Sequence, residues 1–184
     1  AGDTNLVVTG SGAVLDLSSL MYLGQIGETG SQMLISATGG SQLDLSSLGY
    51  ISNPNAIHVT AQGAGSLVDL VSLDGVLESG YFEINALDGG RVNLGPMTEL
   101  ENEFNFVSSG VGSVLDISDV SYLSGGSLSA VDGGAIYNAN LYAVDNVTLM
   151  LDNASHFDAD SLGVVQDSVL ILTGGEWTFE NLMA

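Results

Sequence analysis

The chain is a succession of short segments in which apolar and polar residues alternate, separated by turns rich in glycine and serine. Most segments contain a Leu-Asp-Leu-like triplet, as at residues 15–17, 43–45 and 115–117. Alternation with a period of two is typical of a β-strand with one buried face. The triplets therefore predict strands whose flanking residues point inward and whose middle residue points outward, with strand following strand and no helix between them.

These triplets belong to an internal repeat. If the middle residue of each triplet is its anchor, successive anchors are 28, 25, 24, 23, 21, 21 and 20 residues apart. The positions one before, four after and seven after the anchor are apolar, and the position four before it is glycine with one exception, Ala154. Aligned apolar positions at this spacing are typical of solenoid folds. The anchors are Asp16, Asp44, Asp69, Asn93, Asp116, Tyr137, Asp158 and Thr178.

The repeat predicts an all-β fold, a single-stranded parallel β-helix or β-solenoid of about eight coils of 20–28 residues. We expect one domain over residues 1–184 that tapers toward its C-terminal end as the repeats shorten. The glycine position suits a corner at which the backbone takes a positive φ or neighbouring coils approach closely. The leucine spacing also allows a leucine-rich repeat, but that fold needs an asparagine ladder and a longer convex segment, where this chain has glycine and serine.

The ends and the hydropathy of the chain suggest a soluble piece of something larger. No run of 18 apolar residues is present, so no membrane insertion is expected, and the first residues lack the regions of a signal peptide. The chain begins and stops inside repeat-like strands. We therefore expect it to be a fragment or processed piece of a longer protein.

Charge narrows the choice of partners. The chain has 22 acidic residues, one arginine and no lysine, which gives a formal net charge of −21. Such a surface repels phosphate backbones and anionic lipids, so nucleic-acid binding and electrostatic membrane docking are excluded, whereas metal cations remain possible partners. The absence of cysteine excludes disulfides and thiolate chemistry. Because 45% of the residues are apolar, the chain can still bury a sizeable core.

The glycine- and serine-rich coils resemble those of large secreted bacterial β-helix proteins, the adhesins and autotransporter passengers. The resemblance is carried by residues 10–17, 39–45 and 110–117, and it is one of repeat style along the whole chain. It implies a bacterial protein located outside the cell or on its surface, with a structural or adhesive role. The absence of lysine also resembles secreted proteins of saline or marine bacteria.

The repeated aspartates form a candidate metal site. In a stacked solenoid the outward anchors lie about 4.8 Å apart, and like charges at that distance repel by about 1 kcal/mol in water and about 3.5 kcal/mol at an effective dielectric of 20. Either Ca²⁺ relieves this repulsion, since it prefers oxygen ligands, or the residues form a solvated acidic stripe. The glycine-rich nonapeptide of calcium-binding β-rolls is absent. The proposed Ca²⁺ ligands are Asp16, Asp44, Asp69 and Asp116, with Asn93 continuing the column.

Outward tyrosines are the candidate ligand-binding residues. Tyr22, Tyr50 and Tyr122 all stand six residues after an anchor, so they are expected to share one outward column that could stack a carbohydrate or another cell-surface ligand. Simple stacking of the rings on one another is the alternative. Further exposed aromatics are expected at Tyr81, Tyr137 and Tyr142.

Catalysis is not expected. Polysaccharide cleavage needs two carboxylates some 5 to 9.5 Å apart, but enzymes of this fold that process acidic sugars also need basic residues, and the chain has Arg91 alone. No serine stands in a nucleophile elbow. A group of acids around Pro96 is expected to be a charged loop. The candidate catalytic acids are Asp158 and Asp160 beside His156, and Asp116 with Asp119. The charged loop group is a second acidic cluster beside the proposed calcium column and consists of Glu99, Glu101 and Glu103 with Asp74 one coil earlier.

The sequence thus favours a non-catalytic, extracellular structural or adhesive β-solenoid module. Two alternatives stay open. Without capping repeats, a solenoid exposes apolar coil faces and strand edges, which favours self-association into an end-to-end filament. A β-helix that binds or cleaves polysaccharide is the other alternative.

Overall fold

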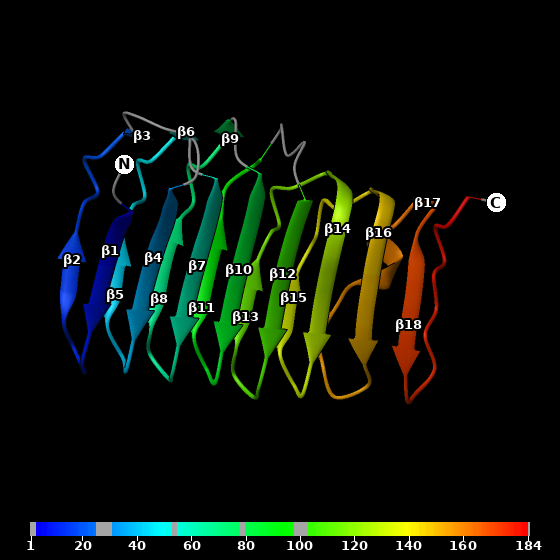
Figure 1. Cartoon of the computed structure of the whole chain (residues 1–184). Coiled ribbons are helices and arrows are strands. Elements are labelled where there is room, and N and C mark those ends of the chain that lie inside the picture. Colours follow the sequence, from blue (N-terminus) through cyan, green and yellow to red (C-terminus); the bar gives the residue numbers. More distant parts are fainter. Residues whose placement is uncertain (1–2, 25–30, 53–54, 78–79, 98–102, 184) are drawn as a thin grey trace.

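The structure, a computed structural model, describes residues 3–24, 31–52, 55–77, 80–97 and 103–183. Over these ranges the chain is an all-β parallel β-solenoid, as the repeat predicts (Figure 1). Each of the first coils passes through three parallel sheets, which a leucine-rich repeat, with one strand and one helical segment per repeat, does not have. No helix in the described ranges is long and apolar enough to cross a membrane.

Sheet A is the largest of the three and contains nine parallel strands. Its register places each repeat position opposite the same position in the next coil, as in Met33↔Ile57 and Phe82↔Phe104. Its strands are β1 (Thr4–Thr9), β4 (Gln32–Thr38), β7 (Ala56–Gln62), β10 (Tyr81–Leu87), β12 (Glu103–Ser109), β14 (Tyr122–Val131) and β16 (Ala143–Asp152), with β17 (Val164–Gln166) and β18 (Val169–Thr173) both pairing with β16.

Sheets B and C complete the coils. The six strands of sheet B carry the anchors, and their register pairs Asp16 with Asp44, Asp44 with Asp69 and Asn93 with Asp116. Sheet B contains β2 (Val14–Asp16), β5 (Gln42–Asp44), β8 (Leu67–Leu70), β11 (Arg91–Leu94), β13 (Val114–Asp116) and β15 (Ala135–Tyr137). Sheet C contains β3 (Tyr22–Gly24), β6 (Tyr50–Ser52) and β9 (Gly75–Leu77).

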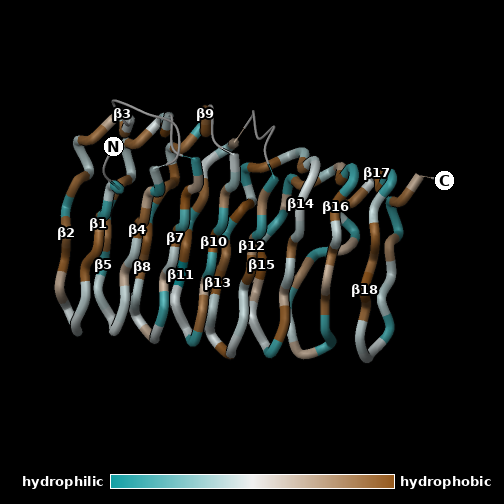
Figure 2. Tube along the Cα trace, viewed as in Figure 1, coloured by the Kyte–Doolittle hydropathy of each residue, from teal (hydrophilic) through white to brown (hydrophobic). Residues whose placement is uncertain are grey.

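The core is one continuous stack of inward side chains. The residues one before the anchor show this most plainly, because Leu43, Val68, Val92, Leu115 and Ile136 are all fully buried. Figure 2 shows the apolar positions recurring from coil to coil along the strands, with polar positions between them. Burial of such aligned side chains is the main favourable contribution to the stability of a solenoid, because each coil covers its neighbour.

The glycine position forms the corner between sheets A and B. Gly40, Gly65 and Gly89 have φ values of +84°, +82° and +88°, which residues with a Cβ rarely adopt. The residue after this glycine is a buried serine in several coils. Its hydroxyl accepts a hydrogen bond from the glycine one coil earlier, from the Gly40 N–H to Ser66 Oγ and from the Gly89 N–H to Ser113 Oγ, both at 2.9 Å.

The solenoid has about six turns, fewer than the eight expected. The strand pattern of sheet B ends after β15, because the buried amide of Asn138 replaces the next rung. Its Oδ1 accepts from the Asp158 N–H at 3.0 Å and its Nδ2 donates to the Asp158 carbonyl at 2.9 Å. Asp158 then caps a short 3₁₀ turn (Ala159–Ser161), and no strand surrounds the last anchor, Thr178.

The expected taper has a structural cause. Residues 25–31, 53–55 and 78–80 separate the strands of sheet C from the sheet A strands that follow them. In β14 and β16 the two segments are one continuous strand, bent where Gly125 and Asn146 have φ values of +71° and +54°. A single left-handed residue therefore joins the two segments in these later coils, and the coils become shorter toward the C-terminal end (Figure 1).

Candidate functional site

The outward anchors of sheet B lie in one column, as predicted, and their carboxylates form turns. Asp16 Oδ1 and Asp44 Oδ1 each accept a hydrogen bond from the backbone N–H two residues later, on Ser18 and Ser46, at 3.0 Å. This bond caps the turn at the end of the strand. The hydrogen bonds from Ser18 lower the pKa of the Asp16 carboxyl.

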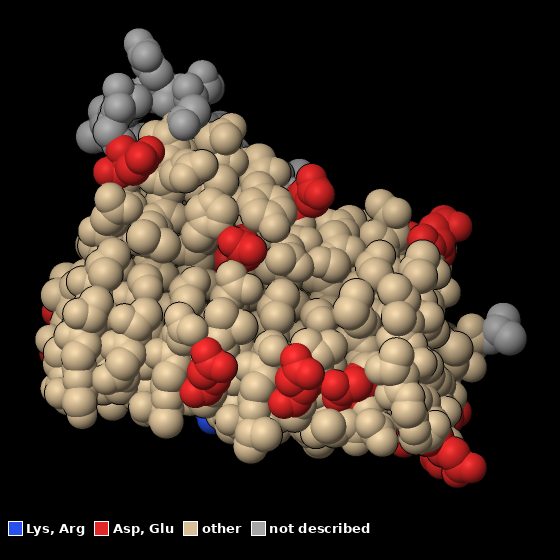
Figure 3. Space-filling model, turned by 60° about the horizontal axis from the view of Figure 1, so that its bottom comes forward, with Lys and Arg blue, Asp and Glu red and all other residues tan. Residues whose placement is uncertain are grey.

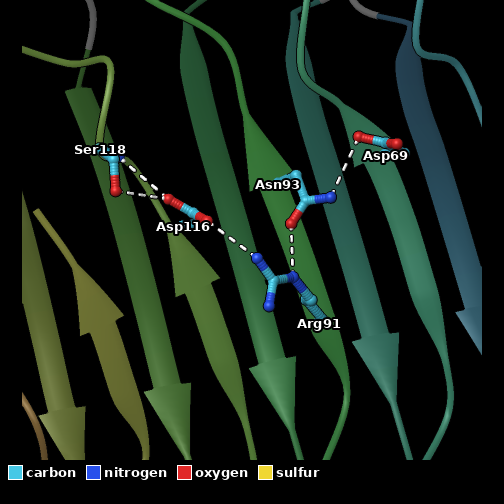
Figure 4. A network of polar contacts seen from close by, with 5 residues as sticks. All are labelled: Asp69, Arg91, Asn93, Asp116 and Ser118. Carbon is cyan, nitrogen blue, oxygen red and sulfur yellow. Dashed lines mark hydrogen bonds and ion pairs between the residues drawn. The ribbon is translucent and has the colours of Figure 1, made fainter.

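Arg91 lies beside the middle of this column, at the outward position two residues before the anchor Asn93 (Figure 4). Its Nη2 lies 2.8 Å from Asp116 Oδ2, and its Nε donates to Asn93 Oδ1 at 2.6 Å. Asn93 in turn donates to Asp69 Oδ1 at 3.2 Å. This chain of contacts neutralises part of the acidic column without a metal ion.

The calcium site stays a prediction. The structure stacks Asp16, Asp44 and Asp69 on successive coils, whereas Asp116 is paired with Arg91. Within the described ranges, no group of three or more histidine or acidic side chains is placed to hold a metal ion. Figure 3 shows acidic residues spread over the face it displays, with some of them next to one another.

The predicted tyrosine column is brought together only in part. Tyr22 lies opposite Tyr50, but Gly75 follows Tyr50 in the next coil, and Tyr122 lies opposite Ala143 near the other end. The phenols reach across to the next coil. Tyr22 hydrogen bonds to Ser52, Tyr50 donates to Asp74 at 3.0 Å, and Tyr122 donates to Asp145 at 3.4 Å.

The candidate catalytic acids serve as turn and packing residues. Asp158 Oδ1 accepts from the Asp160 N–H, and Asp160 Oδ1 accepts from the Glu180 N–H. His156 packs its ring against Tyr137 at a centroid distance of 5.5 Å. Asp116 pairs with Arg91, and Asp119 is exposed. In the loop group, Glu99 and Glu101 lie outside the described residues.

A different feature, an open cleft of about 670 Å³, lies on the outer face of sheet A. It lies where β14 bends at Gly125, next to the first pair of the described register between β12 and β14, Phe104↔Gly126. A Cβ at Gly125 would meet no atom within 4 Å, so this backbone borders open space. The lining residues are Tyr81, Glu103, Phe104, Asn105, Ser124, Gly125, Gly126, Ser127 and Asn146.

A row of hydrogen bonds across four coils fixes the floor of this cleft. Glu83 stands between His58 and Asn105, with Glu83 Oε2 2.7 Å from His58 Nδ1 and Glu83 Oε1 accepting from Asn105 Nδ2 at 3.4 Å. Ser127 donates to Asn105 Oδ1 at 2.6 Å. The amide of Asn105 is thus held from both sides, in a fixed orientation at the cleft.

Tyr81 supplies the aromatic wall of the cleft. It lies opposite Glu103 in the strand register, and its ring centroid is 6.1 Å from that of His58. Burial raises the pKa of the Tyr81 phenol, and the negative charges of Glu83 and Glu103 add to the rise, while a hydrogen bond with Asn105 opposes it. The phenol therefore stays protonated at neutral pH.

The sequence treated these cleft residues separately. The sequence predicts Tyr81 as an exposed aromatic residue and Glu103 as part of a charged loop, and it does not place the two residues in one site. The available signal was Gly125-Gly126 within a strand pattern, which is typical of a bulge or a close approach of the backbone. A bulge on a polar strand face is where a ligand cleft is most easily formed.

Comparison of the chain with known protein families, curated proteins and solved structures finds no match. The function proposed below therefore rests on the residues and their geometry.

Proposed function

We propose that the chain is a non-catalytic structural and adhesive module of a secreted or cell-surface bacterial protein. The observation that carries the structural role is the continuous core, which extends through the coils as one cluster of buried apolar side chains from Met33 to Leu162. Parallel ladders join every coil to the next. Such a rod holds surface side chains at fixed spacing, which suits the display of a binding surface. The resemblance of the coils to secreted adhesins supports the location.

The adhesive role is tested with beads that carry the chain through its C-terminal end. We expect the beads to be retained, against a washing flow, on surfaces coated with polysaccharide or glycoprotein. Incubation of the same surfaces with the soluble chain should release no new reducing ends. Failure of retention on every surface contradicts adhesion, and released reducing ends contradict a non-catalytic role.

A second candidate function, end-to-end assembly, is favoured by the two ends of the solenoid. At the first coil, inward residues such as Leu6, Leu15 and Leu17 are only partly buried, whereas their counterparts one coil later are fully buried. Leu170 and Leu172 are likewise partly covered at the other end. In the described residues, β1 and β18 each have a strand partner on one side only. All strands are parallel, so the free edge of β18 has the direction that β1 of a second copy requires.

Assembly is tested by light scattering over a concentration series at low and high salt. A charge of −21 opposes association, so we expect species larger than 18.8 kDa that grow when salt screens the charge. Leu15→Glu should abolish this growth, because it places a carboxylate in the half-covered end. Val14→Glu is the matched control, because Val14 is the adjacent residue and points outward. A constant mass of 18.8 kDa under all conditions contradicts assembly.

A further inference from the structure

We infer that the cleft between Tyr81 and the bend of β14 binds a saccharide unit without acidic groups, and an amino sugar in preference. The inference rests on the adhesive part of the proposed function and names its ligand. It places the ligand on the outer face of sheet A, in a different sheet from the predicted column of Tyr22 and Tyr50. The shape of the cleft, its polar groups and its charge each support this inference.

The shape of the cleft fits a small ligand held by a rigid wall. A volume of about 670 Å³ lies within the range of about 300–1,000 Å³ that is typical of small-molecule sites. The bend at Gly125 and Asn146 opens the cleft in the backbone itself, because both residues are left-handed. The ligand therefore enters a preformed site, which limits the entropy lost on binding.

The polar groups of the cleft match a ligand rich in hydroxyl groups. Asn105 presents an amide whose orientation is fixed by Glu83 and Ser127. The hydroxyl of Ser124 and the carboxylate of Glu103 line the same cleft. Ser124 and Glu103 offer a ligand a hydroxyl donor and carboxylate acceptors, and Asn105, already bonded to Glu83 and Ser127, keeps a second acceptor site on its Oδ1.

The aromatic ring completes the match. The Tyr81 ring is amphipathic, with an apolar face that can cover the C–H face of a sugar ring and a hydroxyl that can reach its polar edge. Its neighbours His58 and Asn105 hold it in place beside the cleft. The cleft thus brings a flat ring together with a fixed amide and a hydroxyl group.

Charge sets the preference among saccharides. Glu103 is exposed at the cleft, Glu83 lies behind it, and the only arginine of the chain, Arg91, belongs to sheet B. A sugar acid would therefore meet negative charge without a basic partner. A protonated amino sugar would gain from Glu103 and from the π face of Tyr81.

The test is a titration of the full chain with oligomers of glucosamine, glucose and galacturonic acid, and with oligolysine as a cationic non-saccharide. We expect binding of the glucosamine oligomer about fivefold or more tighter than that of the glucose oligomer at low salt, and no binding of the acidic oligomer. Tyr81→Ala and Asn105→Ala should each weaken binding about tenfold or more. Tyr50→Ala, the matched control from the predicted column, should change it by less than about twofold.

Glu103→Gln keeps the test valid if Tyr81→Ala fails to fold, because Glu103 is exposed. This variant should bind the glucosamine and glucose oligomers equally. The inference is overturned if the folded wild-type chain binds none of the oligosaccharides, if Tyr50→Ala weakens binding as much as Tyr81→Ala, or if oligolysine binds and glucosamine oligomers do not. If the beads adhere to a surface but the soluble chain binds no oligosaccharide, this inference is contradicted and the adhesive role is not.

Discussion

The outward side chains of sheet B and of sheet A both form rows across the coils, but the two rows use their polar groups differently. In sheet B aspartate recurs at most anchors, and Asp16, Asp44 and Asp116 each accept a hydrogen bond from the backbone two residues later in their own turn. In sheet A the residue type changes in every coil, and the bonds run between coils, from His58 through Glu83 to Asn105. A residue type that recurs from coil to coil therefore serves a turn that the coils share. Residue types that change from coil to coil form a site at one place in the sheet.

The largest predicted effect follows from a change at the bend of β14, which forms the cleft on sheet A. A Cβ added in Gly126→Ala would lie 2.4 Å from the Phe104 carbonyl oxygen and 2.6 Å from Phe104 Cδ1. The backbone of β14 must then shift, and we expect the free energy of unfolding to fall by about 2–3 kcal/mol. Denaturant melts measure the loss. Gly125→Ala is the control at the neighbouring residue. It costs only the strain of a positive φ, about 1 kcal/mol, because a Cβ there meets open space.

The second prediction separates the turn role of the sheet B aspartates from a calcium role. Asp44→Ala removes the acceptor for the Ser46 N–H and should lower the free energy of unfolding by about 1 kcal/mol. Asp44→Asn keeps an acceptor oxygen and removes one charge from the column, so its stability should stay close to that of the wild type. Both are measured in millimolar Ca²⁺ and in chelator. A rise in melting temperature with Ca²⁺ that both variants lose would instead assign the column to the metal.

A residue that differs from its neighbours at the same repeat position does not by itself indicate a binding site. Ser108 is an example. Its hydroxyl is buried and has no hydrogen-bond partner, and it lies opposite Ala86 and Ala130 in the neighbouring coils. Ser108→Ala should therefore raise the free energy of unfolding by about 1 kcal/mol, because it removes an unpaired polar group. Ser113→Ala is the control, because Ser113 has partners, and it should be destabilising. A destabilised Ser108→Ala would show that the hydroxyl is satisfied.

The fold could be predicted from the repeat because each coil needs buried apolar residues and a corner at the same positions. The inward column at Leu43 and Leu115 and the corner glycines could be aligned by eye, and the structure places them as expected. The number of turns was overestimated because one buried amide, Asn138, replaces a strand rung. The cleft could not be derived, since it depends on the left-handed bend at Gly125, a position that recurs at Asn146 and Asp167 with a different residue type each time. The Asp-x-Ser spacing predicts the turn role of the aspartates, although their charge points first to a metal site.

The corner that lacks its glycine gives a pH-dependent prediction. At Ala154 the Asp152 carboxylate supports the turn, accepting from the Ala154 N–H at 3.0 Å and from the Ser155 hydroxyl at 2.6 Å. The Ser155 hydrogen bond, ahead of the backbone ones, lowers the pKa of Asp152. Its stabilisation is therefore present above the ordinary carboxyl pKa of about 3.9 and is lost as the pH falls through the lowered value.

We accordingly expect Asp152→Ala to be less stable than the wild type by about 0.5 kcal/mol at neutral pH. The difference should vanish near pH 2 or below, which is about two units under the ordinary value. Asp119→Ala removes the same charge from an exposed residue and serves as the control in the same pH series. A difference that persists unchanged in acid would show that the side chain acts by packing.

The smallest predicted effect concerns Arg91, the basic side chain beside the anchor column of sheet B. Arg91 is 43% exposed in its side chain and Asp116 26%, so solvent screens their ion pair. Arg91→Met keeps the apolar stem but removes the charge, and we expect a loss of about 0.5 kcal/mol or less at low salt. The loss should shrink at about 0.5 M salt, because the remaining repulsion between carboxylates is then screened. Melts of both proteins at the two salt concentrations measure it. A loss that does not depend on salt would mean that Arg91 stabilises sheet B through its hydrogen bond to Asn93 and not through its charge.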